Sequence, residues 1–169
     1  MEINGKTAVI TGAASGIGKA AAVELAKEGI SALALVDLSD KILDLKGTIR
    51  KINEECSVEV YQGDTTDSNF RTSIYDEMLA KYGPVNICIP AAGITRDALS
   101  VKIKRDRAKA KVYPVENFRQ VVEVNLIAPI YWALEMVAQT AEQRSIKKSG
   151  KWTPDEGTQG VVVFIGSVS

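Results

Sequence analysis

Three glycines within residues 11–18 have the spacing that points most directly to chemistry. The segment reads Thr-Gly-Ala-Ala-Ser-Gly-Ile-Gly and places the glycines at positions 12, 16 and 18. Glycine permits a tight turn and lets the backbone come close to a phosphate group. A helix that begins here would also direct its free N–H groups and its dipole toward an anion. The segment therefore predicts a loop that binds the diphosphate of a dinucleotide, although a glycine-rich turn without function has the same short pattern.

The residues on either side supply the strand and the helix that such a loop needs. Residues 6–11 are β-branched and apolar without alternation, which is typical of a parallel strand buried on both faces. Residues 16–28 have apolar side chains at helical spacing and are followed by Gly29. Further strands are predicted over 32–36, 57–61, 85–89 and 161–165, and further helices over 40–54, 67–81 and 116–142. This alternation indicates an α/β protein with a doubly wound parallel sheet.

An aspartate follows the second predicted strand, about 20 residues after the glycine loop. A carboxylate at this place binds the hydroxyls of an adenosine ribose and repels a 2′-phosphate. Leu38, Ser39 and Asp40, which follow Asp37, offer no arginine to receive such a phosphate. The sequence therefore predicts NAD rather than NADP as the cofactor. The competing interpretation is that Asp37 only caps a loop.

Several motifs in order resemble those of the short-chain dehydrogenase/reductase family. The Gly-x-x-x-Gly-x-Gly spacing at 12–18 is that of the family. The later matches are Gly63-Asp64-Thr65-Thr66-Asp67, Pro90-Ala91-Ala92-Gly93, Val124-Asn125-Leu126 and Gly166-Ser167-Val168-Ser169. The resemblance implies a Rossmann-like sheet with strand order 3-2-1-4-5 that lacks the last two strands of the family. It also implies a single NAD-binding domain over residues 1–169 that is incomplete at its C-terminus.

The resemblance assigns roles to individual residues. Asn125 would hold a water in a proton relay, and Ser167 would orient the substrate oxygen. Asp64 would meet the adenine. The residues expected to bind the cofactor are Gly12, Ser15, Gly16, Ile17, Gly18, Asp37, Leu38, Asp64, Thr65, Ala91, Ala92 and Gly93.

The chain departs from the family pattern at two places. Ala91 stands where the family usually has asparagine, so one side-chain hydrogen bond between neighbouring strands is missing. None of the five tyrosines has a lysine four residues later, so the catalytic Tyr-x-x-x-Lys is absent from these residues. We expect the intact protein to interconvert an alcohol and a ketone by hydride transfer with NAD, and the 169-residue piece alone to be inactive. The alternative is a non-catalytic NAD-binding or regulatory module.

Two segments look like insertions relative to the family. Residues 100–111 include six basic residues, all within 102–111, and lie between the fourth predicted strand and the helix with Asn125. The preceding Gly93-Ile94-Thr95-Arg96-Asp97 resembles β-ketoacyl carrier protein reductases and acetoacetyl-CoA reductases. The substrate could therefore be an acyl-CoA or acyl carrier protein thioester that meets this basic segment, which is otherwise a solvated charge run. Residues 142–159 are interpreted as a surface loop.

Composition excludes several other classes of function. A net charge of zero gives no field that would attract nucleic acid, and no apolar run approaches the length of a membrane span. The chain has no histidine, which excludes Ser-His-Asp chemistry and makes a metal site unexpected. A cytoplasmic location follows as the default. The helix at 116–142 is apolar around much of its circumference, which indicates a homodimer or homotetramer, or else additional packing within the chain.

Overall fold

A five-stranded parallel sheet forms the centre of the protein. The computed structural model describes residues 1–103, 109–146 and 157–166. The strands are β1 (Thr7–Thr11), β2 (Ala32–Asp37), β3 (Ser57–Gln62), β4 (Ile87–Pro90) and β7 (Val161–Val162), in the order β3-β2-β1-β4-β7. Every pairing in this sheet is parallel. The predicted doubly wound fold and its strand order are confirmed, with β7 as the fifth strand.

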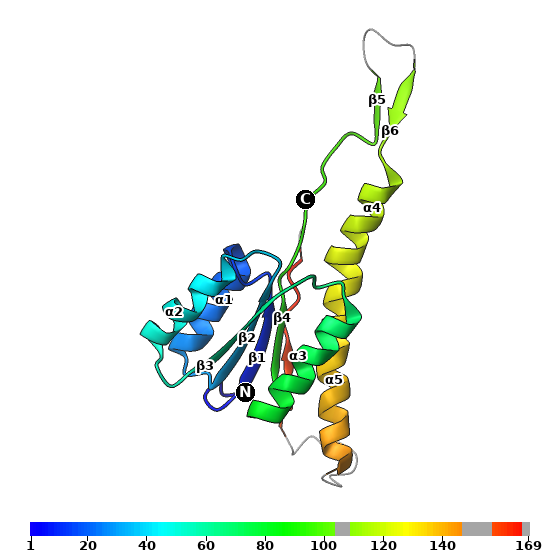
Figure 1. The fold of residues 1–169 in the computed structure, drawn as a ribbon. Helices are drawn as coiled ribbons and strands as arrows, with labels where there is room; N and C mark the ends of the chain where they lie inside the picture. The colour runs from blue at the N-terminus through cyan, green and yellow to red at the C-terminus, as the bar shows by residue number, and fades with distance from the viewer. Residues whose placement is uncertain (104–108, 147–156, 167–169) are drawn as a thin grey trace.

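Helices cover both faces of the sheet (Figure 1), and the side chains between helices and sheet form two apolar layers. Helices α1 (Gly16–Lys27) and α2 (Ile42–Ile52) pack on one face, where Ile10 and Leu35 are fully buried. Helices α3 (Ser68–Tyr82) and α5 (Ala128–Ile146) pack on the other, where Val9 and Val36 are fully buried. Alternate strand residues therefore face opposite layers, which explains why the predicted strands are apolar throughout.

The edge strand is shorter than the sequence predicts. Residues 161–165 were expected as a strand, but only Val161 and Val162 have that conformation. The N–H groups of Val161 and Val163 donate to the carbonyl oxygens of Asn86 and Cys88 at 2.8 and 3.0 Å. Alternate residues of β4 thus face β7, and the next one is Pro90, which has no N–H to donate. The ladder therefore ends at this point.

The long helix is interrupted, so the prediction of one regular helix over 116–142 is wrong in its middle. It consists of α4 (Val115–Val122), a π-helical turn η1 (Glu123–Ile127) and α5. The N–H of Ala128 donates to the carbonyl of Glu123, five residues earlier. Pro129 lacks the N–H that an α-helix would direct to the carbonyl of Asn125, and its ring would clash with that carbonyl. Asn125 therefore lies at the centre of a widened turn.

The first predicted insertion includes a hairpin rather than only a loop. Strands β5 (Val101–Ile103) and β6 (Ala110–Val112) pair antiparallel, and they project beyond the carboxyl end of the sheet (Figure 1). All six of their residues are exposed. The predicted loop at 142–159 begins later than expected, because α5 continues to Ile146. Residues 104–108 and 147–156 of these two insertions lie outside the described residues.

Candidate functional site

A cleft of about 610 Å³ lies where β1, β2, β3 and β4 end. Loops that follow parallel strands meet at one edge of the sheet, so residues far apart in the sequence come together here. Every residue expected to bind the cofactor lines this cleft. Five further residues complete the described lining, namely Gly63, Ile94, Arg96, Gln120 and Val124.

The three glycines of the first loop have different structural reasons. A Cβ atom at Gly18 would lie 2.3 Å from the carbonyl oxygen of Gly12, and one at Gly12 would lie 2.7 Å from the N atom of Ala92. Gly18 therefore allows helix α1 to pack closely against the segment after β1, and Gly12 allows the loop after β4 to pack closely against the same segment. Gly16 has a φ of +52° and open space around it, so its requirement is conformational.

The N-terminus of α1 fits an anion. Ser15 is its N-cap residue in an extended conformation, yet its side chain makes no capping hydrogen bond, and the first turn contains no acidic residue. The N–H groups of this turn therefore have no side-chain cap, and no carboxylate opposes a phosphate there. Together with the glycine loop, this end of the helix has the donor set that a diphosphate needs.

The carboxylate of Asp37 connects two loops at the edge of the cleft. Its Oδ2 accepts a hydrogen bond from the N–H of Ala14, and its Oδ1 accepts one from the N–H of Ser39, both at 2.9 Å. The bond to Ser39 is the loop cap of the competing interpretation. A carboxylate has about four acceptor sites, so these two bonds leave capacity for ribose hydroxyls. The structural role and the proposed binding role are therefore compatible.

The loop after β3 is held by hydrogen bonds within itself and by one from a distant helix. Oδ1 of Asp64 accepts hydrogen bonds from the N–H and the hydroxyl of Thr66 at 2.9 and 2.8 Å. Asp67 caps helix α3 by accepting from the N–H groups of Asn69 and Phe70. The indole Nε1 of Trp132 donates to the carbonyl oxygen of Thr65 at 2.9 Å. The sequence motifs did not indicate Trp132.

The loop after β4 is held from both sides. The Thr11 hydroxyl accepts the N–H of Ala92 at 3.1 Å, so a bond from β1 anchors this loop although Ala91 replaces the family's asparagine. The Asn125 side chain accepts from the N–H of Ile94 at 2.9 Å and donates to its carbonyl at 2.8 Å. Asn125, which lies in the π turn, thus contacts the loop after β4 directly. Ser167, the other residue predicted to be catalytic, lies outside the described residues.

Arg96 is the only cation among the described residues that line the cleft. Its side chain donates to the carbonyl of Thr95 at 2.9 Å, and its own carbonyl accepts from the Tyr113 hydroxyl at 2.6 Å. Tyr113 follows β6, so this bond attaches the base of the hairpin to the cleft. The sequence analysis placed Arg96 in a segment that resembles a substrate motif and did not include it among the cofactor-binding residues.

Other reactive side chains lie in the core. Burial raises the pKa of the Cys88 thiol and of the Cys56 thiol to about 11, so neither is a thiolate at neutral pH. Within the described ranges, no three of the side chains that commonly bind metals form a group. The polar groups described at the cleft include backbone donors, the carboxylates of Asp37 and Asp64, the amide of Asn125 and the guanidinium of Arg96.

The fold is an α/β domain of the Rossmann-like type, with a cleft at the carboxyl ends of its parallel strands. The family model of short chain dehydrogenases matches residues 6–169, and the chain belongs to this family. The chain is 36% identical over 128 residues to the 3-oxoacyl-[acyl-carrier-protein] reductase FabG of Thermotoga maritima, a match that covers 75% of this chain and 46% of that protein. It is 29% identical over 168 residues to the 3-hydroxyacyl-CoA dehydrogenase type-2 of Bos taurus, covering 99% and 58%.

Solved structures agree on the fold. A short-chain type dehydrogenase/reductase from Mycobacterium marinum has a TM-score of 0.68 at 24% identity, covering 84% of this chain and 53% of that one. An NAD⁺-bound xylitol dehydrogenase has a TM-score of 0.62 at 22% identity, covering 87% and 51%. The chain spans about half the length of the curated relatives it matches, from 46% to 58% in the two given above.

Proposed function

We propose that this protein is an oxidoreductase that interconverts an alcohol and a ketone with NAD(H). The observation that supports this most is the convergence of all twelve predicted cofactor-binding residues on one cleft, in a chain that belongs to a dehydrogenase family. The cofactor, when bound, supplies the hydride chemistry. The polypeptide binds it, orients it and controls proton transfer at the substrate oxygen.

Each part of the cleft has a distinct task in this proposal. The N-terminus of α1 and Gly16 receive the diphosphate, and Asp37 with Leu38 receives the adenosine ribose. The loop at Ala91, Ala92 and Gly93 lies on the other side of β1 and lines the nicotinamide half. Asn125 holds this loop through Ile94, which fixes the floor on which the reacting ring rests.

The preference for NAD follows from the charges at the adenosine end. Asp37 and Asp64 line the cleft here, and Arg96, the single cation among the described lining residues, comes from the loop after β4 instead. A 2′-phosphate beside Asp37 would bring two anions together, with no cation from the described lining beside them to neutralise the charge. NAD, which carries a free 2′-hydroxyl, gains a hydrogen bond to the same carboxylate.

Two catalytic roles are assigned within the chain. Asn125 would position a water of the proton relay, and Ser167 would orient the substrate oxygen. The Tyr-x-x-x-Lys pair of the family is not among these 169 residues. The proposed activity therefore belongs to the whole protein, and the 169-residue piece alone is expected to be inactive.

The substrate class that we propose is a small alcohol or ketone presented as an acyl-CoA or acyl carrier protein thioester. The names of the two relatives given above describe reactions on such thioesters. Arg96 lines the cleft, and the exposed hairpin attached to it carries Lys102 and Lys111 on one face. These cations suit the phosphates of a thioester carrier. No role for nucleic acid or a membrane is part of the proposal, and the location is cytoplasmic.

A homodimer or homotetramer is proposed from the long helix. Several of its apolar side chains are exposed by 40% or more, among them Phe118, Leu126, Ile130, Leu134 and Val137. The described part of the chain leaves this face uncovered, which supports an interface between subunits over packing within the chain. The stretch Val115–Ile146 also has the length and hydropathy of a membrane span, but Trp132 and Met136 bury its other face against the sheet. If one face of this helix packs on the sheet and the other on a second copy of the chain, both of its apolar faces are buried.

Binding and turnover of NADH by the whole protein test this function. Titration with NADH and NADPH is expected to show tighter binding of NADH, and acetoacetyl-CoA is expected to oxidise bound NADH. Binding of NADH without turnover of any ketone would instead support the non-catalytic module. Failure to bind either dinucleotide would overturn the proposal.

A further inference from the structure

The buried indole of Trp132 makes a hydrogen bond for which the proposed function has assigned no role. Trp132 is fully buried between α5 and the sheet, yet its Nε1 donates to the carbonyl oxygen of Thr65 at 2.9 Å. Thr65 lies in the loop after β3 and lines the cleft. A core side chain thus contacts the backbone of the site directly.

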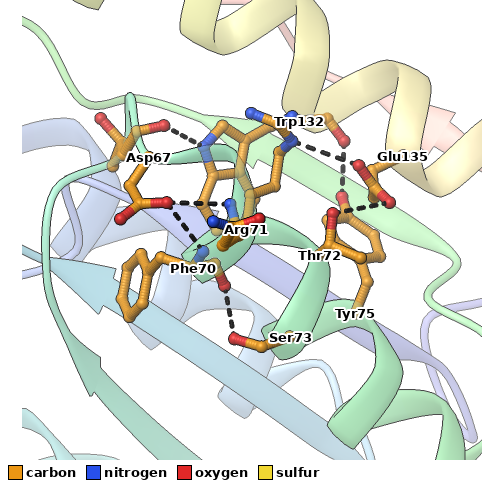
Figure 2. Close-up of polar contacts among 10 residues, drawn as sticks. Asp67, Phe70, Arg71, Thr72, Ser73, Tyr75, Trp132 and Glu135 are labelled. Atoms are coloured by element: carbon orange, nitrogen blue, oxygen red, sulfur yellow. Dashed lines mark hydrogen bonds and ion pairs between the residues drawn. The ribbon is translucent and has the colours of Figure 1, made fainter.

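Trp132 is itself fixed by its neighbours on α3. The Tyr75 hydroxyl donates to the Trp132 carbonyl at 2.6 Å, and the two ring centroids lie 5.8 Å apart. One turn farther along α5, Oε2 of Glu135 accepts from Nε of Arg71 at 3.2 Å, and both pairs are visible in Figure 2. The packing of the two rings between α3 and α5 sets the direction of the indole N–H, and this direction determines where the Thr65 carbonyl can lie.

The position of Thr65 in the sheet connects this bond to one half of the ligand. In the order β3-β2-β1-β4, the loops after β3 and β2 lie on one side of the phosphate-binding loop, and the loop after β4 lies on the other. Asp37 at the end of β2 marks the first side as the adenosine half. Asp64 and Thr65 belong to that half.

We propose that Trp132 is a positioning residue for the adenosine half of the bound dinucleotide. Its N–H fixes the Thr65 carbonyl, and through it the Asp64–Thr65 segment that faces the adenine. This inference rests on the proposed dinucleotide binding. It adds a specific expectation, which is that loss of the bond weakens binding of adenosine groups and leaves the nicotinamide half unaffected.

The substitution Trp132→Phe in the whole protein tests this expectation. Phenylalanine keeps an aromatic ring but leaves the Thr65 carbonyl without its donor, and we expect the Kd of NADH to rise by about fivefold to tenfold. The Kd of reduced nicotinamide mononucleotide, which has no adenosine, is expected to stay within about twofold. Equal losses for both ligands, or no loss for NADH, would overturn the inference.

Tyr75→Phe provides the matched control. It removes the hydroxyl that bonds to the Trp132 carbonyl but leaves the indole bond to Thr65 in place. We expect it to lower the melting temperature while both ligands keep their affinities. An adenosine-specific loss in Tyr75→Phe as large as that in Trp132→Phe would assign the effect to helix packing and contradict a specific role for the indole.

A measurement on the unaltered protein covers the case in which Trp132→Phe does not fold. In the ¹⁵N-labelled protein each tryptophan gives one indole N–H signal, and replacing the others one at a time by phenylalanine, beginning with Trp152, assigns the Trp132 signal by elimination. Adding AMP is expected to shift the Trp132 signal, and adding nicotinamide mononucleotide is not. A Trp132 signal that does not shift at saturating AMP would refute the positioning role. If the unaltered protein binds neither NADH nor AMP, the proposed function itself fails, and the inference that rests on it fails with it.

Discussion

Substituting Asp37 with asparagine removes the charge at the adenosine end of the cleft while keeping the size of the side chain. A phosphate about 4 Å from a carboxylate is repelled by about 4 kcal/mol per pair of unit charges at an effective dielectric constant near 20. Asp37 is half-buried, so solvent screening reduces this to about 2 kcal/mol, or about thirtyfold in Kd. We therefore expect Asp37→Asn to bind NADPH about thirtyfold more tightly.

The same substitution should weaken NADH. Both oxygens of Asp37 accept backbone N–H groups, from Ala14 and Ser39. Asparagine has one acceptor oxygen, and its NH₂ group would face the other N–H, so one loop bond is lost along with a charge-assisted bond to the ribose. This loss amounts to about 1.5 kcal/mol, or about tenfold in Kd.

The assay is titration of the whole protein with NADH and NADPH, followed by nucleotide fluorescence. The preference for NADH over NADPH is expected to fall by about three hundredfold in Asp37→Asn, from the two effects together. Asp40→Asn is the matched control, because Asp40 is exposed, lies three residues away and does not line the cleft. An unchanged preference in Asp37→Asn, or an equal change in Asp40→Asn, would refute the assignment of Asp37 as the discriminating residue.

Four further predictions concern the fold and the assembly. Gly18→Ala places a Cβ atom 2.3 Å from a backbone oxygen and should lower the free energy of unfolding by about 2–4 kcal/mol. The matched control is Gly47→Ala on α2, where the added Cβ atom meets open space and should raise the free energy of unfolding by about 0.5–1 kcal/mol. Urea unfolding measures both changes. The hydrogen bond from the Tyr82 hydroxyl lowers the pKa of Glu59 from its ordinary value of 4.5. The stabilisation of the fold by ionised Glu59 is therefore complete above pH 4.5 and is lost as the pH falls through the lowered pKa. Glu59→Gln should therefore make unfolding free energy less dependent on pH in the acid range, and an unchanged profile would contradict this. Leu134→Glu should turn an oligomer into a monomer in light scattering, and an unaltered protein that is already monomeric would exclude the proposed interface. The Cys88 thiol should resist iodoacetamide at neutral pH until the protein unfolds, and rapid labelling of the folded protein would contradict its burial.

The sequence predicted the buried parallel strands and the location of the cleft because both depend on local patterns, whereas the strand order was implied by the resemblance to the family. Buried parallel strands are apolar throughout, and their loops necessarily meet at one edge of the sheet. Once Gly12 and Asp37 were placed at the ends of the first two strands, a shared cleft followed. The same reasoning placed Ala92 beside them, although these residues are separated by up to 80 positions in the chain.

The features that were not predicted depend on contacts between distant parts of the chain. The bond from Trp132 to Thr65 joins residues 67 positions apart, and neither residue has a local pattern that indicates it. The interruption of the long helix did have a local signal, since Pro129 lies four residues after Asn125. The hairpin of β5 and β6 was not predicted, because the run of lysines and arginines in this region was interpreted as a solvated segment.

The π-helical turn explains how one helix can hold both halves of the cleft. Asn125 contacts Ile94 after β4, and Trp132 contacts Thr65 after β3, so the two side chains must reach loops on opposite sides of β1. In a regular α-helix, residues seven positions apart lie within about 20° of the same face. A π turn takes in one residue more than an α turn, which rotates the residues that follow by about 100°. The widened turn at Glu123–Ile127 therefore separates the directions of the two side chains, which an uninterrupted α-helix would present on the same face.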